Sequence, residues 1–185
     1  MVSPFTLATL PVTPWKNGAG ETREIVRVTG ANTPFLWRAS IATLQSDGPF
    51  SRFDGIDRVI VLLEGAPFWL RGENMEHWLE PGVPWAFAGE WPLASEGIIG
   101  PGMDFNIMTQ RHRASAQVVI ATAPQRPDAE GVAYVLNGVW RMAGADHHAG
   151  SGIWWQKETP GELVPLTADA ALILTTITRH SNIGI

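Results

Sequence analysis

The stretch RVIVLLEG, residues 58–65, decides the fold. Its five central residues are all apolar, so both faces of an extended segment are suited to a buried interior. A Glu-Gly pair then ends the run with a turn signal. In an extended chain Arg58, Ile60 and Leu62 share one face. The stretch therefore predicts a strand that is buried on both sides and begins with an arginine.

The same design returns in the second half of the chain. The stretch VAYVLNG, residues 132–138, is again an apolar run that ends in a turn signal, and Gly138 lies 73 residues after Gly65. Two further pairs of segments match, namely 81–85 with 150–155 and 103–108 with 170–177. Because a repeat sets the architecture, we expect two similar β halves, residues 1–122 and 123–185, joined by a Pro-containing connection into one compact unit.

Short apolar segments between turn signals predict strands along the whole chain. The predicted strands are 24–28, 37–44, 58–63, 68–71, 85–88, 105–109, 118–121, 133–136, 139–142, 153–156 and 172–178. No stretch holds a helical period over three turns. Asn137-Gly138 lies between two apolar runs and is a strong hairpin signal. The pattern is typical of a β-sandwich or β-barrel.

Composition excludes several classes of protein. The net charge is −5 with no basic run, which argues against nucleic acid as a partner. Cysteine is absent, so neither a disulfide nor a thiolate metal site can form. No apolar run approaches the roughly 20 residues of a membrane span, and the N-terminus lacks the pattern of a signal peptide. We therefore expect a cytoplasmic protein with no membrane partner.

The first half resembles the two sequence motifs of the cupins. Gly48 and Gly65 take the ends of the first motif, and Arg58 falls where a metal-binding Glu is expected. In the second motif a Pro-Gly pair precedes Trp85, which takes the position of a His. The resemblance implies an all-β bicupin, with two cupin-like β-barrel or jelly-roll halves, from which the usual metal ligands are missing.

These replacements argue against a bound metal ion. Arginine stays protonated and has no free lone pair, and tryptophan offers only an N–H donor. Asp146, His147 and His148 form the one cluster of possible ligands, which we expect to be an exposed hairpin loop. We therefore expect no metal and no other cofactor. The alternative is a metal enzyme that uses His77, His147 or His148 in another register.

Arg58 replaces the negative charge of a metal-binding Glu, expected inside the first barrel, with a positive charge. A buried guanidinium without a partner costs several kcal/mol, so it must be paired. One candidate partner is an internal carboxylate, and the other is an anionic ligand, since the guanidinium fork matches a carboxylate. Both alternatives remain open from the residues alone.

Long stretches of the chain resemble the HutD/Ves family. They are 15–25 (WKNGAGETREI), 37–42 (WRASIA), 48–55 (GPFSRFDG), 58–65 and 103–108 (MDFNIM). The resemblance implies a bicupin and a homodimer. It also implies a link to histidine utilisation for HutD or to stress response for Ves, with a proposed role in binding an intermediate such as N-formylglutamate or urocanate.

Alternation along the strands selects the residues of a pocket for a small anionic metabolite. Thr22 and Glu24 are expected to share one face with Val26 and Val28, so that Glu24 pairs with Arg58 or Arg38. The small residues after Asn17 would let backbone amides approach an anion. The candidate ligand-binding residues are Trp15, Asn17, Thr22, Arg23, Glu24, Arg38, Ser40, Arg58, Trp85 and Asn106.

Three kinds of function are compatible with these residues besides the metal enzyme. The first is a non-catalytic, regulatory protein that binds an organic carboxylate. The second is a metal-independent isomerase or hydrolase with Glu24 or Asp104 as general base. The third is an interaction protein whose barrel is filled by side chains.

Overall fold

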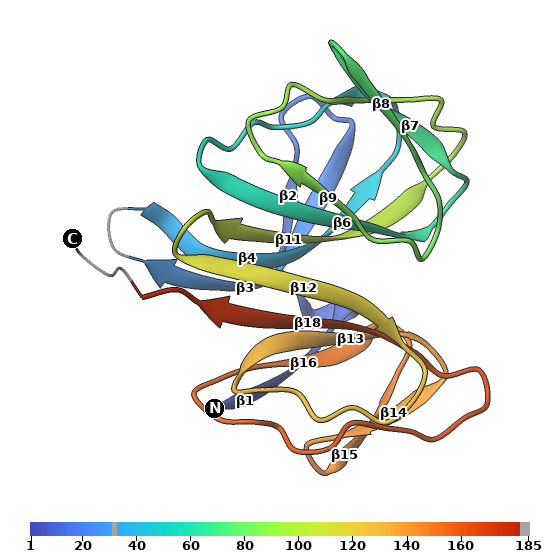
Figure 1. Ribbon diagram of the computed structural model, residues 1–185. Helices are drawn as coiled ribbons and strands as arrows, with labels where there is room; N and C mark the ends of the chain where they lie inside the picture. The colour runs from blue at the N-terminus through green and yellow to red at the C-terminus, as the bar shows by residue number, and fades with distance from the viewer. Residues whose placement is uncertain (31–32, 182–185) are drawn as a thin grey trace. The chain divides into compact units, whose positions relative to one another are not determined.

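The computed structural model describes residues 1–30 and 33–181. Within these residues the chain forms β-strands and one 3-10 helix, η1 (Leu7–Thr9). It divides into two compact units (Figure 1). We call Pro11–Ser115, with the chain from His180 onward, the first barrel. Met1–Leu10 and Ala116–Arg179 form the second barrel.

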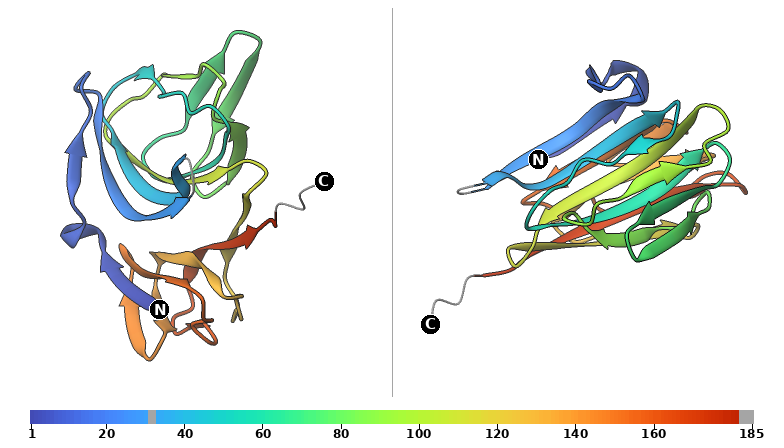
Figure 2. Two further views of the ribbon diagram at one scale, coloured as in Figure 1. Left: turned by 90° about the vertical axis from the view of Figure 1, so that its left-hand side faces the viewer. Right: turned by 90° about the horizontal axis from the view of Figure 1, so that it is seen from above.

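The first barrel is built from two antiparallel sheets. The larger sheet has the order β2-β3-β4-β11-β6-β9, and the smaller has the order β5-β10-β7-β8. The strands are β2 (Val12–Pro14), β3 (Gly20–Gly30), β4 (Thr33–Leu44), β5 (Gly48–Pro49), β6 (Ile56–Glu64), β7 (Phe68–Gly72), β8 (Met75–Leu79), β9 (Trp85–Ala88), β10 (Ala94–Glu96) and β11 (Gly102–Gln110). Figure 2 (left) looks along this barrel and shows the strands closing into a ring.

The second barrel repeats the same pairing. Its strands are β1 (Val2–Thr6), β12 (Ala114–Ala121, which begins at the end of the first unit), β13 (Glu130–Asn137), β14 (Val139–Met142), β15 (Ala145–His148), β16 (Ser151–Gln156), β17 (Val164–Pro165) and β18 (Ala171–Arg179). The order β12-β18-β13-β16 matches β4-β11-β6-β9, and the hairpin β14-β15 matches β7-β8. The predicted all-β bicupin fold is therefore confirmed, and the two halves share one topology.

The division between the units differs from the predicted boundary after residue 122. Residues 1–10 belong to the second barrel, because β1 adds to the edge of its sheet through Val2↔Trp155 and Thr6↔Ser151. Such a pairing over more than 140 residues leaves no local signal in the sequence.

The Asn137-Gly138 pair does not close a hairpin, so that prediction is wrong. β13 lies in the five-stranded sheet, whereas β14 pairs with β15 and β17 in another sheet. Gly138 has φ +71°, and a Cβ there would lie 2.2 Å from Thr167 Oγ1. The pair therefore carries the chain from one sheet to the other.

The interiors of the two barrels differ. In the second barrel Trp140, Met142 and Trp155 are fully buried in one apolar cluster. Burial of each such side chain stabilises the fold by roughly 2–3 kcal/mol. The first barrel has its own cluster around Leu44, Ile60 and Leu62, but this cluster occupies only part of the interior. In the described part of the chain, no helix has the length and apolar character to cross a membrane.

Candidate functional site

The first barrel contains a cavity of about 470 Å³. Its walls come from the larger sheet, from the turn after β2 and from the segment between β5 and β6. The lining residues are Pro14, Trp15, Lys16, Asn17, Thr22, Arg38, Ser40, Ala42, Pro49, Phe50, Ser51, Phe53, Arg58, Asp104, Asn106 and Met108. Seven of the ten predicted ligand-binding residues are among them.

Strand register brings the polar side chains of the wall together. Residues directly opposite each other in antiparallel strands point to the same face. The pairs are Arg38↔Met108, Ser40↔Asn106 and Ala42↔Asp104 between β4 and β11, and Met108↔Arg58 between β11 and β6. Alternation along each strand therefore places all of these side chains on the cavity wall.

Arg58 is the buried cation of this wall, with 6% of its surface exposed. Its Nη1 atom donates to the carbonyl oxygen of Ser51 at 3.2 Å, and its Nη2 atom donates to Oδ1 of Asn106 at 3.2 Å. Burial lowers the pKa of Arg58 to about 10, which the charge of Asp104 partly offsets. The guanidinium therefore stays protonated at neutral pH.

Aromatic rings surround the guanidinium of Arg58. Its carbon Cζ lies 4.9 Å from the ring centre of Phe87, 5.4 Å from that of Phe53 and 5.8 Å from that of Phe50. The faces of aromatic rings carry partial negative charge and attract a cation at these distances. Three rings thus partly replace the water that the guanidinium loses on burial.

Asp104 is the buried carboxyl group of the wall, with 1% of its surface exposed. Asn106 Nδ2 donates to its Oδ1 atom, while no described group bonds to its Oδ2 atom. Burial raises the pKa of Asp104 to about 7, although the hydrogen bond from Asn106 and the charge of Arg58 act in the opposite direction. Asp104 can therefore hold or release a proton near neutral pH.

Glu24 lies outside the cavity lining, where it pairs with two arginines. Its Oε1 atom accepts from Nε of Arg38 and from Nε of Arg27, each at 2.8 Å. These two contacts lower the pKa of Glu24, although burial acts in the opposite direction and is the largest single influence. Of the two partners predicted for Glu24, the structure selects Arg38 and not Arg58.

The predicted face of β3 is wrong beyond Glu24. Glu24 lies opposite Ser40, but a β-bulge follows, and Val26 lies opposite Ala39. The extra residue in the bulge moves Val26 to the face away from the cavity. It also brings Arg27 opposite Arg38, which explains how one carboxylate binds both arginines.

In the turn after β2, backbone amides donate hydrogen bonds to acceptors within the turn itself. Ala19 N donates to Oδ1 of Asn17 at 2.9 Å, and Gly18 N donates to the carbonyl oxygen of Trp15 at 3.1 Å. Trp15 Nε1 donates to Oγ1 of Thr22 at 2.8 Å and fixes the indole against the strand. The first two bonds occupy amides that the predicted anion nest requires, so this segment is an ordinary turn at the cavity wall.

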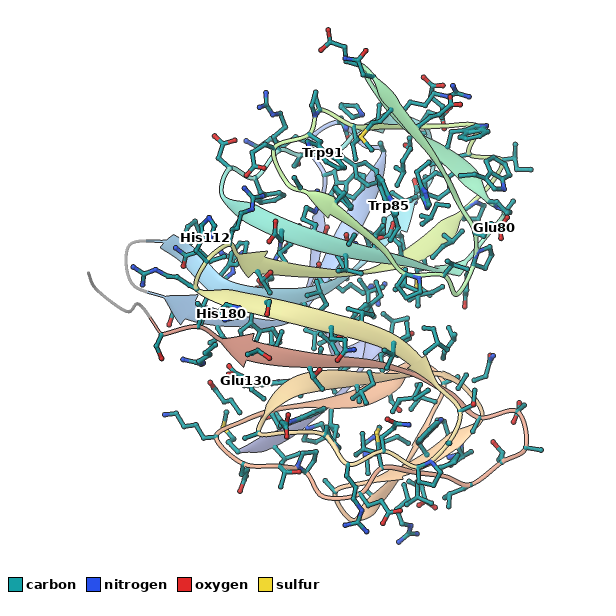
Figure 3. All side chains as sticks on the ribbon, viewed as in Figure 1. Glu80, Trp85, Trp91, His112, Glu130 and His180 are labelled. Atoms are coloured by element: carbon teal, nitrogen blue, oxygen red, sulfur yellow. The ribbon has the colours of Figure 1, made fainter. Side chains whose placement is uncertain are left out.

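Trp85 and Arg23, like Glu24, do not line the cavity. The ring of Trp85 stacks on His77 with centres 4.3 Å apart, on the side of β7 and β8 (Figure 3). Phe87, two residues later on β9, lies opposite Arg58 and takes the place expected for Trp85. The cupin motif therefore pointed to residue 85, whereas the residue that faces the guanidinium of Arg58 is residue 87.

Lys16, Phe50 and Phe53 belong to the site but were not predicted from the sequence. All three lie in irregular segments, where the alternation of a strand gives no orientation. All three do fall within stretches that resemble the family, Lys16 within 15–25 and Phe50 and Phe53 within 48–55, and this resemblance was the one available signal.

The residues present do not fit a metal ion of the kind that cupins hold. Arg58 faces the cavity at the position of a ligand, and Asp104 is the one carboxylate among the described lining residues. Residues 1–30 and 33–181 contain no group of three or more His, Asp or Glu side chains that could hold a metal ion. Asp146, His147 and His148 form strand β15 rather than the predicted loop, so His147 and His148 point to opposite faces.

The duplicated topology and the barrel with an internal cavity define a bicupin. The chain belongs to the HutD family, whose model matches residues 7–174. It is 39% identical to Protein Ves of Cronobacter sakazakii over 178 residues, which cover 94% of this chain and 97% of that protein. It is 41% identical to Protein Ves of Citrobacter koseri over 157 residues, covering 82% of this chain and 81% of that protein.

Solved structures agree with this assignment. The structure of HutD from Pseudomonas fluorescens SBW25 (formate condition) has a TM-score of 0.86 and 26% identity, covering 98% of this chain and 100% of that chain. Oxalate decarboxylase of Bacillus subtilis has a TM-score of 0.63 and 8% identity, covering 98% of this chain and 78% of that chain. The second likeness shows the cupin fold alone.

Proposed function

We propose that the first barrel binds a small organic carboxylate and that the protein is a non-catalytic, regulatory binding protein. The observation that carries this proposal is the burial of Arg58 without an ion-pair partner. Its guanidinium is buried, yet no carboxylate oxygen of residues 1–30 and 33–181 makes an ion pair with it. A buried charge without a direct ion-pair partner is costly, and the charge of Asp104 offsets the effect of burial only in part. An anionic ligand in the cavity would supply the direct partner.

The rest of the cavity suits the same ligand class. Its volume of about 470 Å³ matches a metabolite of modest size. Arg38 provides a second guanidinium on the wall, partly neutralised by Glu24, and the exposed Lys16 provides a further cation. Phe50 and Phe53 supply apolar surface. A dicarboxylate or an unsaturated carboxylate such as N-formylglutamate or urocanate fits this mixture of charge and apolar wall.

Thermal unfolding with added carboxylates tests the proposal. At 100 times the dissociation constant a ligand stabilises the folded state by about 2.7 kcal/mol. We expect N-formylglutamate, urocanate or a related carboxylate to raise the midpoint of unfolding of the wild type and to leave Arg58→Met unchanged. Arg141→Met, an exposed arginine of the second barrel, is the matched control and should respond like the wild type. No response of the wild type to any carboxylate would refute the proposal.

A metal-independent enzyme is the second candidate, favoured by Asp104 alone. Asp104 lines the cavity and its raised pKa suits a general base, whereas Glu24 lies outside the lining and is held ionised by two arginines. Proton abstraction by Asp104 would exchange a carbon-bound hydrogen of the bound carboxylate for deuterium in D₂O. Exchange seen by NMR with the wild type but not with Asp104→Asn would establish the enzyme.

A further inference from the structure

We propose that the ligand of the first barrel carries a hydrogen-bond donor, an N–H or O–H group close to its carboxylate, and that Oδ2 of Asp104 accepts from this donor. The inference rests on the proposed carboxylate site and narrows its ligand class. Simple carboxylates are then weak ligands, whereas amino, acylamino or hydroxy acids are strong ones.

The two oxygens of Asp104 have different environments. Oδ1 accepts from Nδ2 of Asn106, whose other end holds Arg58, so this oxygen is fixed inside the protein. Oδ2 is buried, no donor among the described residues reaches it, and Asp104 is one of the residues that line the cavity. A buried acceptor without a donor is costly, and native structures keep few of them. A donor on the ligand is the partner that this oxygen lacks.

The arrangement is not that of a structural ion pair. Asn106 bonds to both Arg58 and Asp104 and stands between them, and no contact short enough for an ion pair joins the two charges in the described structure. A direct pair would have satisfied both groups without any ligand. Instead, the wall presents a cation and an acceptor side by side, one amide apart. Such a wall suits a molecule that carries a carboxylate and a donor close to each other.

Other buried polar atoms without partners do not offer the same site. Arg58 Nε also lacks a partner among the described residues and belongs to the same wall, but it is itself a donor and cannot accept from a donor on the ligand. Trp140 Nε1 and Thr175 Oγ1 lack hydrogen-bond partners too, but neither residue lines the cavity. The other charged residues that line the cavity are Arg58 on β6, Arg38 on β4 and Lys16 in the turn after β2, and Glu24 pairs with both Arg38 and Arg27. Of these charges, Arg58 acts on Asp104. In the proposed complex these lining cations bind the carboxylate of the ligand, and Asp104 accepts from the ligand's N–H or O–H group.

A series of ligands with one carbon skeleton tests the inference. Glutarate has two carboxylates and no donor, whereas L-glutamate adds an ammonium group and N-formyl-L-glutamate adds an amide N–H. Binding is measured by isothermal titration calorimetry at pH 8, where Asp104 is mostly ionised. We expect one of the two donor-bearing ligands to bind the wild type at least about tenfold more tightly than glutarate, since unpaired buried polar groups discriminate strongly.

Asp104→Asn reverses the chemistry at the position of Oδ2. The amide oxygen can still accept from Asn106, but the amide nitrogen now donates where Oδ2 accepted. We expect the preference for donor-bearing ligands to shrink to about threefold or less, while glutarate binds at least as tightly as to the wild type, because the substitution removes a negative charge from the wall. Asp146→Asn, at an exposed carboxylate of the second barrel, should keep the full preference.

The outcomes separate this inference from the proposed function. Equal binding of glutarate and both donor-bearing ligands to the wild type would overturn the inference and leave the carboxylate site intact. Binding of none of the three would overturn the inference, and it would overturn the proposed function as well if urocanate and the other carboxylates of the thermal unfolding test also have no effect. Should Asp104→Asn fail to fold, proton release decides: near pH 7 a donor-bearing ligand should release up to about half a proton from Asp104. Glutarate should release none, and equal release by both ligands would also overturn the inference.

Discussion

The Nη2 atom of Arg58 donates a hydrogen bond to Oδ1 of Asn106 at 3.2 Å. The charge of Arg58 is therefore held by a neutral amide and by aromatic rings rather than by a counter-ion. Such an arrangement orients the guanidinium in the cavity without neutralising it. The rest of the fold must offset the cost of this burial, and under the proposed function an anionic ligand would reduce that cost.

Replacement of Arg58 by Met should separate stability from binding. Met is apolar and flexible, and it removes the penalty of a buried charge without a counter-ion. We expect Arg58→Met to keep or raise the free energy of unfolding, by on the order of 1 kcal/mol, in urea denaturation without ligand. A loss of about 2 kcal/mol or more would show that Arg58 is mainly a structural residue.

The charge of Asp104 should make stability depend on pH. Burial raises the pKa of Asp104 from its ordinary 3.8 to about 7, so between these values the folded chain keeps a proton that the unfolded chain has lost. The free energy of unfolding contributed by Asp104 therefore falls as pH rises from 3.8 to about 7, and it is flat above. The full difference is at most about 4 kcal/mol.

Comparison with Asp104→Asn isolates this contribution. Other carboxylates with lowered pKa, such as Glu24, act in the opposite direction as pH falls. We expect the difference in the free energy of unfolding, wild type minus variant, to decline from pH 4 toward pH 7 in urea denaturation without ligand. A constant difference over this range would contradict the raised pKa.

Gly138 should be far less replaceable than Gly144. Both have positive φ, at +71° and +80°, but a Cβ on Gly138 would lie 2.2 Å from Thr167 Oγ1, whereas Gly144 has no atom within 4 Å of that position. We expect Gly144→Ala to cost about 1 kcal/mol and Gly138→Ala about 3 kcal/mol or more. Urea denaturation of the two variants checks this, and equal costs would contradict the close packing between the two sheets.

Metal analysis should find no stoichiometric ion. With Arg58 in the position of a ligand and Asp104 as the one described carboxylate of the wall, we expect less than about 0.1 Fe, Mn, Ni or Zn per chain after growth in metal-replete medium. The midpoint of thermal unfolding should also be unchanged by added metal or by EDTA. A bound ion near one per chain would revive the metal-enzyme alternative through other residues.

Much of the fold could be predicted from sequence, because strands carry local patterns. The buried strand predicted at 58–65 and its repeat at 132–138 correspond to β6 and β13, which both lie in the interior of their sheets. The position of Arg58 inside the barrel followed from the motif spacing and is confirmed. The hairpin at Asn137-Gly138 was wrong, because a Gly with positive φ serves a change of sheet as well as a tight turn.

The site was less predictable, because it depends on long-range register. Glu24 was expected to pair with Arg58 or Arg38, and only the structure, with a bulge after Glu24, selects Arg38. Trp85 was expected at the pocket, but Phe87 lies opposite Arg58. Lys16 and Phe53 lie in irregular segments whose orientation no periodicity reveals.

The sequence by itself determined the all-β repeat, the family, and the arginine at a metal-ligand position, because alternation, turn chemistry and motif spacing are local. Only the tertiary structure decided that Asn106 stands between Arg58 and Asp104 and that one carboxyl oxygen stays unpaired at a cavity wall. These features arise where strands distant in sequence lie side by side, and pairing across strands is set by the packing of the whole barrel.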